Sequence, residues 1–132
     1  MSNAKTILIV DDEPDVLDYL TALFEDNGYE VISATSGKEA FKLAYSFRPA
    51  LITLDITMPD ETGVRTYLNM KNETDLKDIP IIVITATVNS EQNFLGLLDG
   101  FRGPEGFLNK PINIKDLLKL TEELTADSDN SA

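Results

Sequence analysis

The chain has 132 residues, of which 42% are hydrophobic, so it is long enough for one compact domain and too short for two of ordinary size. Its net charge of −12 comes from 23 acidic and 11 basic residues, which argues against direct binding of nucleic acid. Cysteine and histidine are absent, which excludes disulfides, thiolate or imidazole metal sites, histidine phosphodonors and Ser-His-Asp hydrolases.

The termini and the hydropathy pattern indicate a single domain. No apolar run reaches the length of a membrane span or of a signal peptide, so we expect neither and predict a reducing, cytoplasmic location. Residues 1–4 are expected to be a cloning scar and residues 5–126 the folded domain. Residues 127–132 are expected to be a polar tail or the start of a linker.

Short apolar runs alternate with amphipathic stretches along the whole chain. The predicted strands are, in order, Thr6–Val10, Glu30–Ala34, Leu51–Leu54, Ile79–Thr85 and Gly106–Leu108. The predicted helices lie around Val16–Phe24, around Phe41–Phe47, and at Asp60–Lys71, Ser90–Phe101 and Ile114–Leu124. This alternation predicts a doubly wound α/β fold, with a parallel sheet covered by helices on both faces.

Local signals agree with the first two helices. Pro14 suits the first turn of a helix, and Asn27 with Gly28 suits its end. Ser36 and Glu39 have the spacing of a capping box, which predicts that the second helix begins directly after Ser36.

Polar residues follow four of the predicted strands at the point where each strand ends. They are Asp11, Asp12, Asp55, Thr85 and Lys110. In a doubly wound sheet, ligands bind outside the carboxyl ends of the strands, so we expect these side chains to converge at one edge of the sheet.

Three converging carboxylates repel one another unless a cation or protons compensate them. Oxygen ligands without histidine or cysteine favour a hard cation, and Mg²⁺ is the natural choice because it keeps waters that a phosphate can displace. Lys110 would add a second positive charge and Thr85 a hydroxyl, so that one carboxylate could attack phosphorus. The alternative for Asp11 and Asp12 is capping of the first helix, which remains open at this point.

Four segments closely resemble the signature blocks of response-regulator receiver domains. They are Ile7–Glu13, Asp55–Gly63, Ile84–Ala86 and Asn109–Pro111. They occur in the order and at the spacing found in that family, and together they cover almost the whole chain. The resemblance implies a five-stranded, flavodoxin-like fold with strand order 2-1-3-4-5.

The resemblance also implies a phosphoacceptor and a metal site. Asp55 would accept the phosphoryl group. Asp12, Asp55 and the main-chain carbonyl of Thr57 would hold Mg²⁺ or Mn²⁺. Asp11 would act mainly through a bound water.

By the same resemblance, Thr85 and Lys110 would contact the phosphoryl oxygens. Phosphorylation would draw Thr85 inward, and Phe107 would follow and reshape the face formed by the fourth helix, fifth strand and fifth helix. The phosphodonor would be a histidine kinase or a histidine phosphotransfer protein. The domain would catalyse the transfer and its own slow dephosphorylation; the downstream effector and a phosphorylation-dependent homodimer stay open.

The sequence departs from the family pattern in one long stretch. The segment Asp99–Gly106, before the last strand, is longer than usual, which leaves the identity of partners open. Thr57 and Thr87 occupy positions that tune access of the attacking water, so the dephosphorylation rate is open as well.

Two other functions compete with the receiver. A haloacid-dehalogenase-like phosphohydrolase also forms an aspartyl phosphate, but it needs a second aspartate two residues after the first, where this chain has Thr57. A degenerate receiver would act as a phosphorylation-independent interaction module, but here all the active residues are present.

Overall fold

The computed structural model describes residues 4–56, 62–86, 96 and 103–126. Its strands are β1 (Thr6–Val10), β2 (Glu30–Ala34), β3 (Leu51–Asp55), β4 (Ile81–Thr85) and β5 (Gly106–Asn109). They form one parallel sheet with the order β2-β1-β3-β4-β5. The predicted doubly wound fold and strand order are confirmed.

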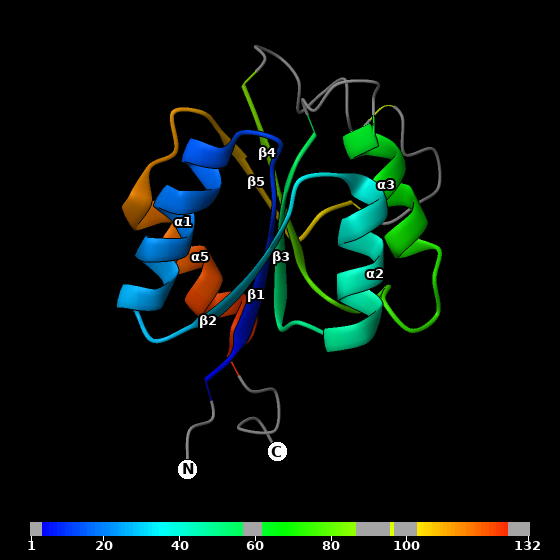
Figure 1. The fold of residues 1–132 in the computed structure, drawn as a ribbon, viewed down its shortest axis with the longest axis horizontal. Coiled ribbons are helices and arrows are strands. Elements are labelled where there is room, and N and C mark those ends of the chain that lie inside the picture. Colours follow the sequence, from blue (N-terminus) through cyan, green and yellow to red (C-terminus); the bar gives the residue numbers. More distant parts are fainter. Residues whose placement is uncertain (1–3, 57–61, 87–95, 97–102, 127–132) are drawn as a thin grey trace.

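Helices cover both faces of the sheet. Helices α1 (Pro14–Asp26) and α5 (Ile114–Thr125) lie on one face, and α2 (Gly37–Phe47) and α3 (Thr62–Lys71) lie on the other (Figure 1). The helix predicted at 90–101 lies outside the described residues except for Gly96, which is helical.

Alternate residues along a strand belong to two separate hydrophobic clusters, one on each face of the sheet. In β1, Ile7 and Ile9 belong to the cluster under α1 and α5, whereas Leu8 and Val10 belong to the cluster under α2 and α3. Every residue of β3 and β4 is buried. Full burial of one such aliphatic side chain contributes about 1.5–3 kcal/mol, so these strands hold the sheet edge that carries the polar residues in a fixed position.

The fourth strand begins later than predicted. The sequence pattern starts it at Ile79, but β4 begins at Ile81. Pro80 has no N–H to donate to the ladder, and its carbonyl instead accepts a hydrogen bond from the N–H of Ile52 at 3.0 Å. The N–H of Ile79 closes a turn to the carbonyl of Leu76.

The helix ends follow the predicted signals with one difference. Helix α1 begins at Pro14 and is followed by Gly28 at φ +90°, a left-handed conformation that glycine adopts without strain. The Ser36 Oγ accepts a hydrogen bond from the Glu39 N–H, as predicted. The Glu39 carboxylate, however, accepts from the N–H of Thr35, not Ser36.

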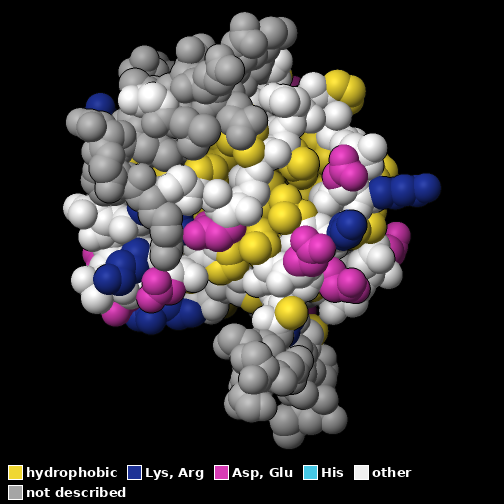
Figure 2. Space-filling view, turned by 180° about the vertical axis from the view of Figure 1, so that it is seen from behind, with side chains coloured by type: hydrophobic (Ala, Val, Ile, Leu, Met, Phe, Trp, Pro, Cys, Tyr) yellow, Lys and Arg dark blue, Asp and Glu magenta, His cyan; other side chains and the backbone are white. Residues whose placement is uncertain are grey.

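The molecular surface reflects the acidic composition. Seen from behind, it shows a band of hydrophobic side chains across its middle, bordered by clusters of Asp and Glu (Figure 2). None of the helices in the described part of the chain is both long enough and apolar enough to cross a membrane.

Candidate phosphoacceptor and metal site

The predicted site residues occupy the carboxyl ends of β1, β3, β4 and β5. Backbone hydrogen bonds continue past the strands and fix these ends in register. The Asp11 N–H donates to the Ala34 carbonyl at 3.1 Å, and the Lys110 N–H donates to the Thr85 carbonyl at 2.8 Å. The side chains that follow are therefore presented from a rigid edge and not from free loops.

Four carboxylates gather at this edge. One oxygen from each of Asp11, Asp12, Glu13 and Asp55 lies within 4.8 Å of the others. Asp11 and Asp55 are buried, whereas Asp12 and Glu13 are exposed. The cluster thus has a buried floor and a solvent-facing rim, through which a cation could enter.

Lys110 is the cation that the structure places against this cluster. Its Nζ lies 3.1 Å from Asp55 Oδ2, 3.3 Å from Asp11 Oδ2 and 3.4 Å from Glu13 Oε1. The peptide bond between Lys110 and Pro111 is cis. This ammonium group pairs with three of the four carboxylates, so among the described residues the cluster keeps an excess of negative charge that attracts a further cation.

The pKa of both Asp11 and Lys110 is raised, but for different reasons. Burial raises the pKa of Asp11 to about 6; a hydrogen bond from the Glu13 N–H opposes this rise and the charge of Asp55 adds to it. Burial alone would lower the pKa of Lys110, but its hydrogen bond to Asp55 and the charges of Asp55 and Asp11 outweigh burial and raise it. Lys110 is therefore held in its charged form.

The donor set fits a hard divalent cation. The clustered atoms are carboxylate oxygens, and the sequence has no histidine or cysteine that would favour a softer metal. Mg²⁺ is usually held by one or two carboxylates together with waters, and the exposed rim at Asp12 leaves room for those waters.

The predicted alternative role of Asp11 and Asp12 as helix caps can be compared with the start of α1. The N-cap residue is Glu13, and its side chain makes no capping hydrogen bond. Asp11 Oδ1 accepts the N–H of Glu13 at 2.9 Å, which orients the carboxylate beside Lys110. Asp11 therefore acts on the residue before the helix, not on the free N–H groups of its first turn.

The remaining predicted residues lie around this cluster. Thr85 is fully buried at the end of β4, next to Asp55 across the sheet, since β3 and β4 pair Asp55 with Ile84. Phe107 is half-buried in β5, opposite Val83, and packs against the cluster under α2 and α3. Thr57, Thr87 and residues 99–102 of the long stretch before β5 lie outside the described residues.

Sequence reasoning missed two features of the site. Glu13 was not predicted to contribute, although it directly follows Asp12 and its carboxylate contacts Lys110. Gly63, in the first turn of α3, packs so closely that an added Cβ would lie 2.4 Å from the Ile56 Cα and 2.8 Å from the Asp55 carbonyl oxygen. The start of α3 thus rests directly on the segment that carries Asp55.

Comparison with known sequences gives a consistent family. Residues 7–122 match the family model of the response regulator receiver domain. The chain is 37% identical over 121 residues to the response regulator SaeR of Staphylococcus epidermidis, covering 91% of this chain and 50% of that protein. It is 31% identical to the protein PilH of Pseudomonas aeruginosa, covering 91% of this chain and 97% of that one. The chain therefore spans about half the length of SaeR and nearly all of PilH.

Solved structures agree with the sequence relatives. The chemotaxis response regulator CheY4 of Vibrio cholerae superposes with a TM-score of 0.79 at 30% identity, covering 92% of this chain and 99% of that one. The signal receiver domain of a signal transduction histidine kinase from Syntrophus aciditrophicus gives 0.82 at 29% identity, covering 93% and 91%.

Proposed function

Since the chain belongs to the response regulator receiver domain family, we propose that Asp55 is its phosphoacceptor and takes a phosphoryl group from a histidine on a partner kinase or phosphotransfer protein. The observation that carries this assignment is the position of the Asp55 carboxylate. It ends a fully buried strand, is itself 3% exposed, and has the Lys110 ammonium 3.1 Å from its Oδ2.

The residues around Asp55 would hold Mg²⁺ or Mn²⁺. Asp12 and Asp55 are the proposed direct ligands, and Asp11 would act mainly through a bound water. The main-chain carbonyl of Thr57, outside the described residues, is the third proposed direct ligand. When bound, the cation would neutralise oxygens of the incoming phosphoryl group.

The chain's own groups would carry out the transfer. A carboxylate oxygen of Asp55 forms the bond to phosphorus while the bond from phosphorus to the donor histidine nitrogen breaks, and the imidazole keeps that electron pair. Lys110 is already held as a cation beside Asp55, so it can turn to a phosphoryl oxygen with little reorganisation. Thr85, from the neighbouring strand end, would donate a hydrogen bond to the same group.

The output of the proposed reaction is a change at β5. Thr85 would follow the phosphoryl group inward, and Phe107 would occupy the space that it leaves. The half-buried state of Phe107 supports this role, because a side chain between core and surface can take either position. Slow self-catalysed dephosphorylation and a cytoplasmic location belong to the same proposal.

Phosphorylation by a small donor tests the assignment directly. Incubation with acetyl phosphate and Mg²⁺ should give a base-labile, acid-stable phosphate on the wild type and none on Asp55→Asn. Equal phosphorylation of the two proteins, or none on either, would contradict the assignment.

The metal assignment needs its own test. Mg²⁺ should raise the melting temperature of the wild type, because it binds the folded state, and this shift should vanish in Asp12→Ala. A full shift in Asp12→Ala would refute Asp12 as a ligand.

Two other functions have their own tests. Turnover of a simple phosphate ester would favour the phosphohydrolase, and equal partner affinity with and without beryllofluoride would favour a phosphorylation-independent module. No described contact favours either of them.

A further inference from the structure

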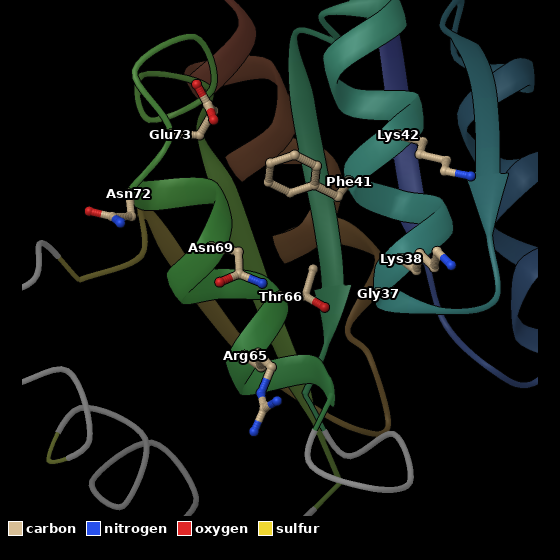
Figure 3. A pocket seen from close by; sticks show the side chains of 9 residues that line it. All are labelled: Gly37, Lys38, Phe41, Lys42, Arg65, Thr66, Asn69, Asn72 and Glu73. Carbon is tan, nitrogen blue, oxygen red and sulfur yellow. The ribbon is translucent and has the colours of Figure 1, made fainter.

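A second hollow lies away from the carboxylate cluster, between α2 and α3. It has a volume of about 640 Å³ and is open to solvent. In Figure 3 the ring of Phe41 points from α2 into the space toward α3, where Asn69 and Thr66 face it. Phe41 also packs against the core cluster on this side, so its ring is held in place at the base of the hollow.

Three basic residues are among those that line this hollow. Lys38 and Lys42 line it from α2, and Arg65 lines it from α3. Lys38 and Lys42 also line an adjoining hollow of about 510 Å³ beside α2, so they form a ridge between the two spaces. In Figure 3 the side chains of Lys38 and Lys42 extend from the flank of α2 that faces away from α3, and Arg65 projects from near the start of α3.

These cations have no acidic partner within the part of the chain that the structure describes. Arg48, Lys71 and Lys110 form ion pairs there, whereas none of the pairs found involves the three basic residues of the hollow. This is unexpected in a chain with a net charge of −12, where carboxylates are abundant. The lining includes a single acid, Glu73, at the opposite end of the hollow from Arg65 (Figure 3). The local charge therefore complements an anionic occupant.

The spacing of the polar groups selects the form of that occupant. Lys38 and Lys42 are one turn apart on α2. Arg65 and Asn69 are one turn apart on α3, and Asn72 directly follows the last residue of that helix, so the three span about 10 Å. The groups are spread along two walls and do not converge on one point, so they suit repeated acidic groups on a chain better than a single phosphate. The acidic remainder of the surface would repel a nucleic acid.

We propose that the hollow between α2 and α3 is a docking site for an acidic segment of a partner protein. An apolar side chain of the segment rests on the ring of Phe41, and one of its carboxylates pairs with Arg65. The segment continues across α2 into the adjoining hollow, where its other carboxylates pair with Lys38 and Lys42. The amide side chains of Asn69 and Asn72 donate hydrogen bonds to its main chain or carboxylates. This binding requires neither phosphate on Asp55 nor a metal.

Fluorescence anisotropy with a designed probe tests the proposal on the unphosphorylated protein. The probe is a short labelled peptide in which glutamate alternates with leucine, and its control carries glutamine in place of glutamate. We expect saturable binding of the glutamate peptide only. The double variant Lys38→Glu/Arg65→Glu should weaken this binding about tenfold or more, since it replaces two attractions by repulsions.

A matched variant separates the effect of the hollow on binding from the effect of the net charge of the protein. Lys115→Glu/Lys119→Glu makes the same change in net charge on exposed positions of α5 and should leave the affinity within about twofold. Phe41→Leu should weaken binding at both low and high salt, because it replaces the ring on which the apolar side chain rests with a smaller side chain. In spectra of the wild type, the side-chain amide signals of Asn69 and Asn72 should shift on titration.

Four results would overturn the docking site. They are no saturable binding of the glutamate peptide, equal binding of the glutamine peptide, an equal loss of affinity in the two double variants, and tighter groove-dependent binding of ATP or a single-stranded oligonucleotide. The last result would assign the hollow to a nucleotide. Because Asp55 takes no part, failure here leaves the phosphoacceptor assignment untouched.

Discussion

The Lys110 Nζ lies 3.1 Å from Asp55 Oδ2 and 3.3 Å from Asp11 Oδ2, so one ammonium group joins two buried carboxylates from different strand ends. The two carboxylates have oxygen atoms within 4.8 Å of each other, so these buried like charges would repel strongly without a cation between them. Lys110 therefore stabilises the metal-free site in addition to its proposed role toward a phosphoryl group. These two roles of Lys110 can be measured separately, because its effect on stability is measurable without any phosphodonor.

Replacing Lys110 by methionine keeps the length of the side chain and removes its charge. In the presence of EDTA we expect the free energy of unfolding to fall by about 2 kcal/mol, because Asp11 and Asp55 lose their buried partner. Mg²⁺ should restore most of that loss, so its stabilising effect should be larger in the variant than in the wild type. Urea unfolding measures both, and Lys119→Met, an exposed position on α5, should change stability by less than about 0.5 kcal/mol. Equal Mg²⁺ effects in the wild type and Lys110→Met would contradict this account.

The raised pKa of Asp11 predicts a dependence of stability on pH. Its pKa is about 6 in the folded protein and 3.8 without the fold, so the folded state binds the proton more tightly. The stability that Asp11 contributes is therefore complete below about pH 4 and is lost as pH rises through about 6.

Comparison with Asp11→Asn isolates this effect from the other carboxylates. In EDTA, the stability of the wild type relative to Asp11→Asn should fall between about pH 4 and pH 7. A constant difference between wild type and Asp11→Asn would show that Asp11 is not protonated more readily in the fold.

The fold and the position of the site could be predicted because both depend on local pattern. Consecutive apolar residues in β3 and β4 indicate strands buried on both faces, and a parallel sheet brings the residues after such strands to one edge. The grouping of Asp11 and Asp55 follows from these two facts alone. The contact between Lys110 and Glu13 does not, because it depends on how an exposed side chain crosses the rim.

The ion pair between Lys71 and Glu105 could not be predicted from the sequence. Lys71 ends α3 and reads as a surface charge, yet its side chain is 2% exposed and its Nζ lies 3.0 Å from Glu105 Oε1. The same ammonium donates to the carbonyls of Lys77 and Ile79, and Glu105 Oε1 accepts the N–H of Ile81. The partners are 34 residues apart, so only the packing of the segment before β5 against α3 brings them together.

The pair between Lys71 and Glu105 should be strongly coupled. Glu105→Gln leaves a buried ammonium without its counter-charge, so we expect a loss of about 3 kcal/mol in the free energy of unfolding. Lys71→Met should also destabilise, and the double variant should lose clearly less than the sum of the two. Urea unfolding of the four proteins gives the coupling energy. Strict additivity would mean that the pair contributes nothing of its own.

Thr53 carries a buried hydroxyl that lacks a hydrogen-bond partner in the described part of the chain. The residue is 1% exposed in the middle of β3, between apolar neighbours. Thr53→Val replaces the hydroxyl by a methyl group of similar shape, so we expect it to stabilise the fold by about 1 kcal/mol. Thr53→Ser keeps the hydroxyl and removes the methyl group, and it should destabilise by a similar amount. If thermal unfolding shows Thr53→Val to be less stable than the wild type, the hydroxyl has a hydrogen-bond partner, such as a buried water.

Gly63 connects the packing of α3 to the proposed phosphoacceptor. A methyl group added there would lie 2.4 Å from the Cα of Ile56 and 2.8 Å from the carbonyl oxygen of Asp55, and both are backbone atoms that cannot rotate away. Gly63→Ala should therefore push α3 away from the end of β3 and lower the free energy of unfolding by about 2 kcal/mol. The displacement should also slow phosphorylation of Asp55 by acetyl phosphate, because the carboxylate leaves its position beside Lys110.

Gly96→Ala is the matched control, since a Cβ at Gly96 meets no atom within 4 Å, and it should change neither property appreciably. Wild-type phosphorylation in a destabilised Gly63→Ala would show that the packing of α3 and the geometry of Asp55 are independent.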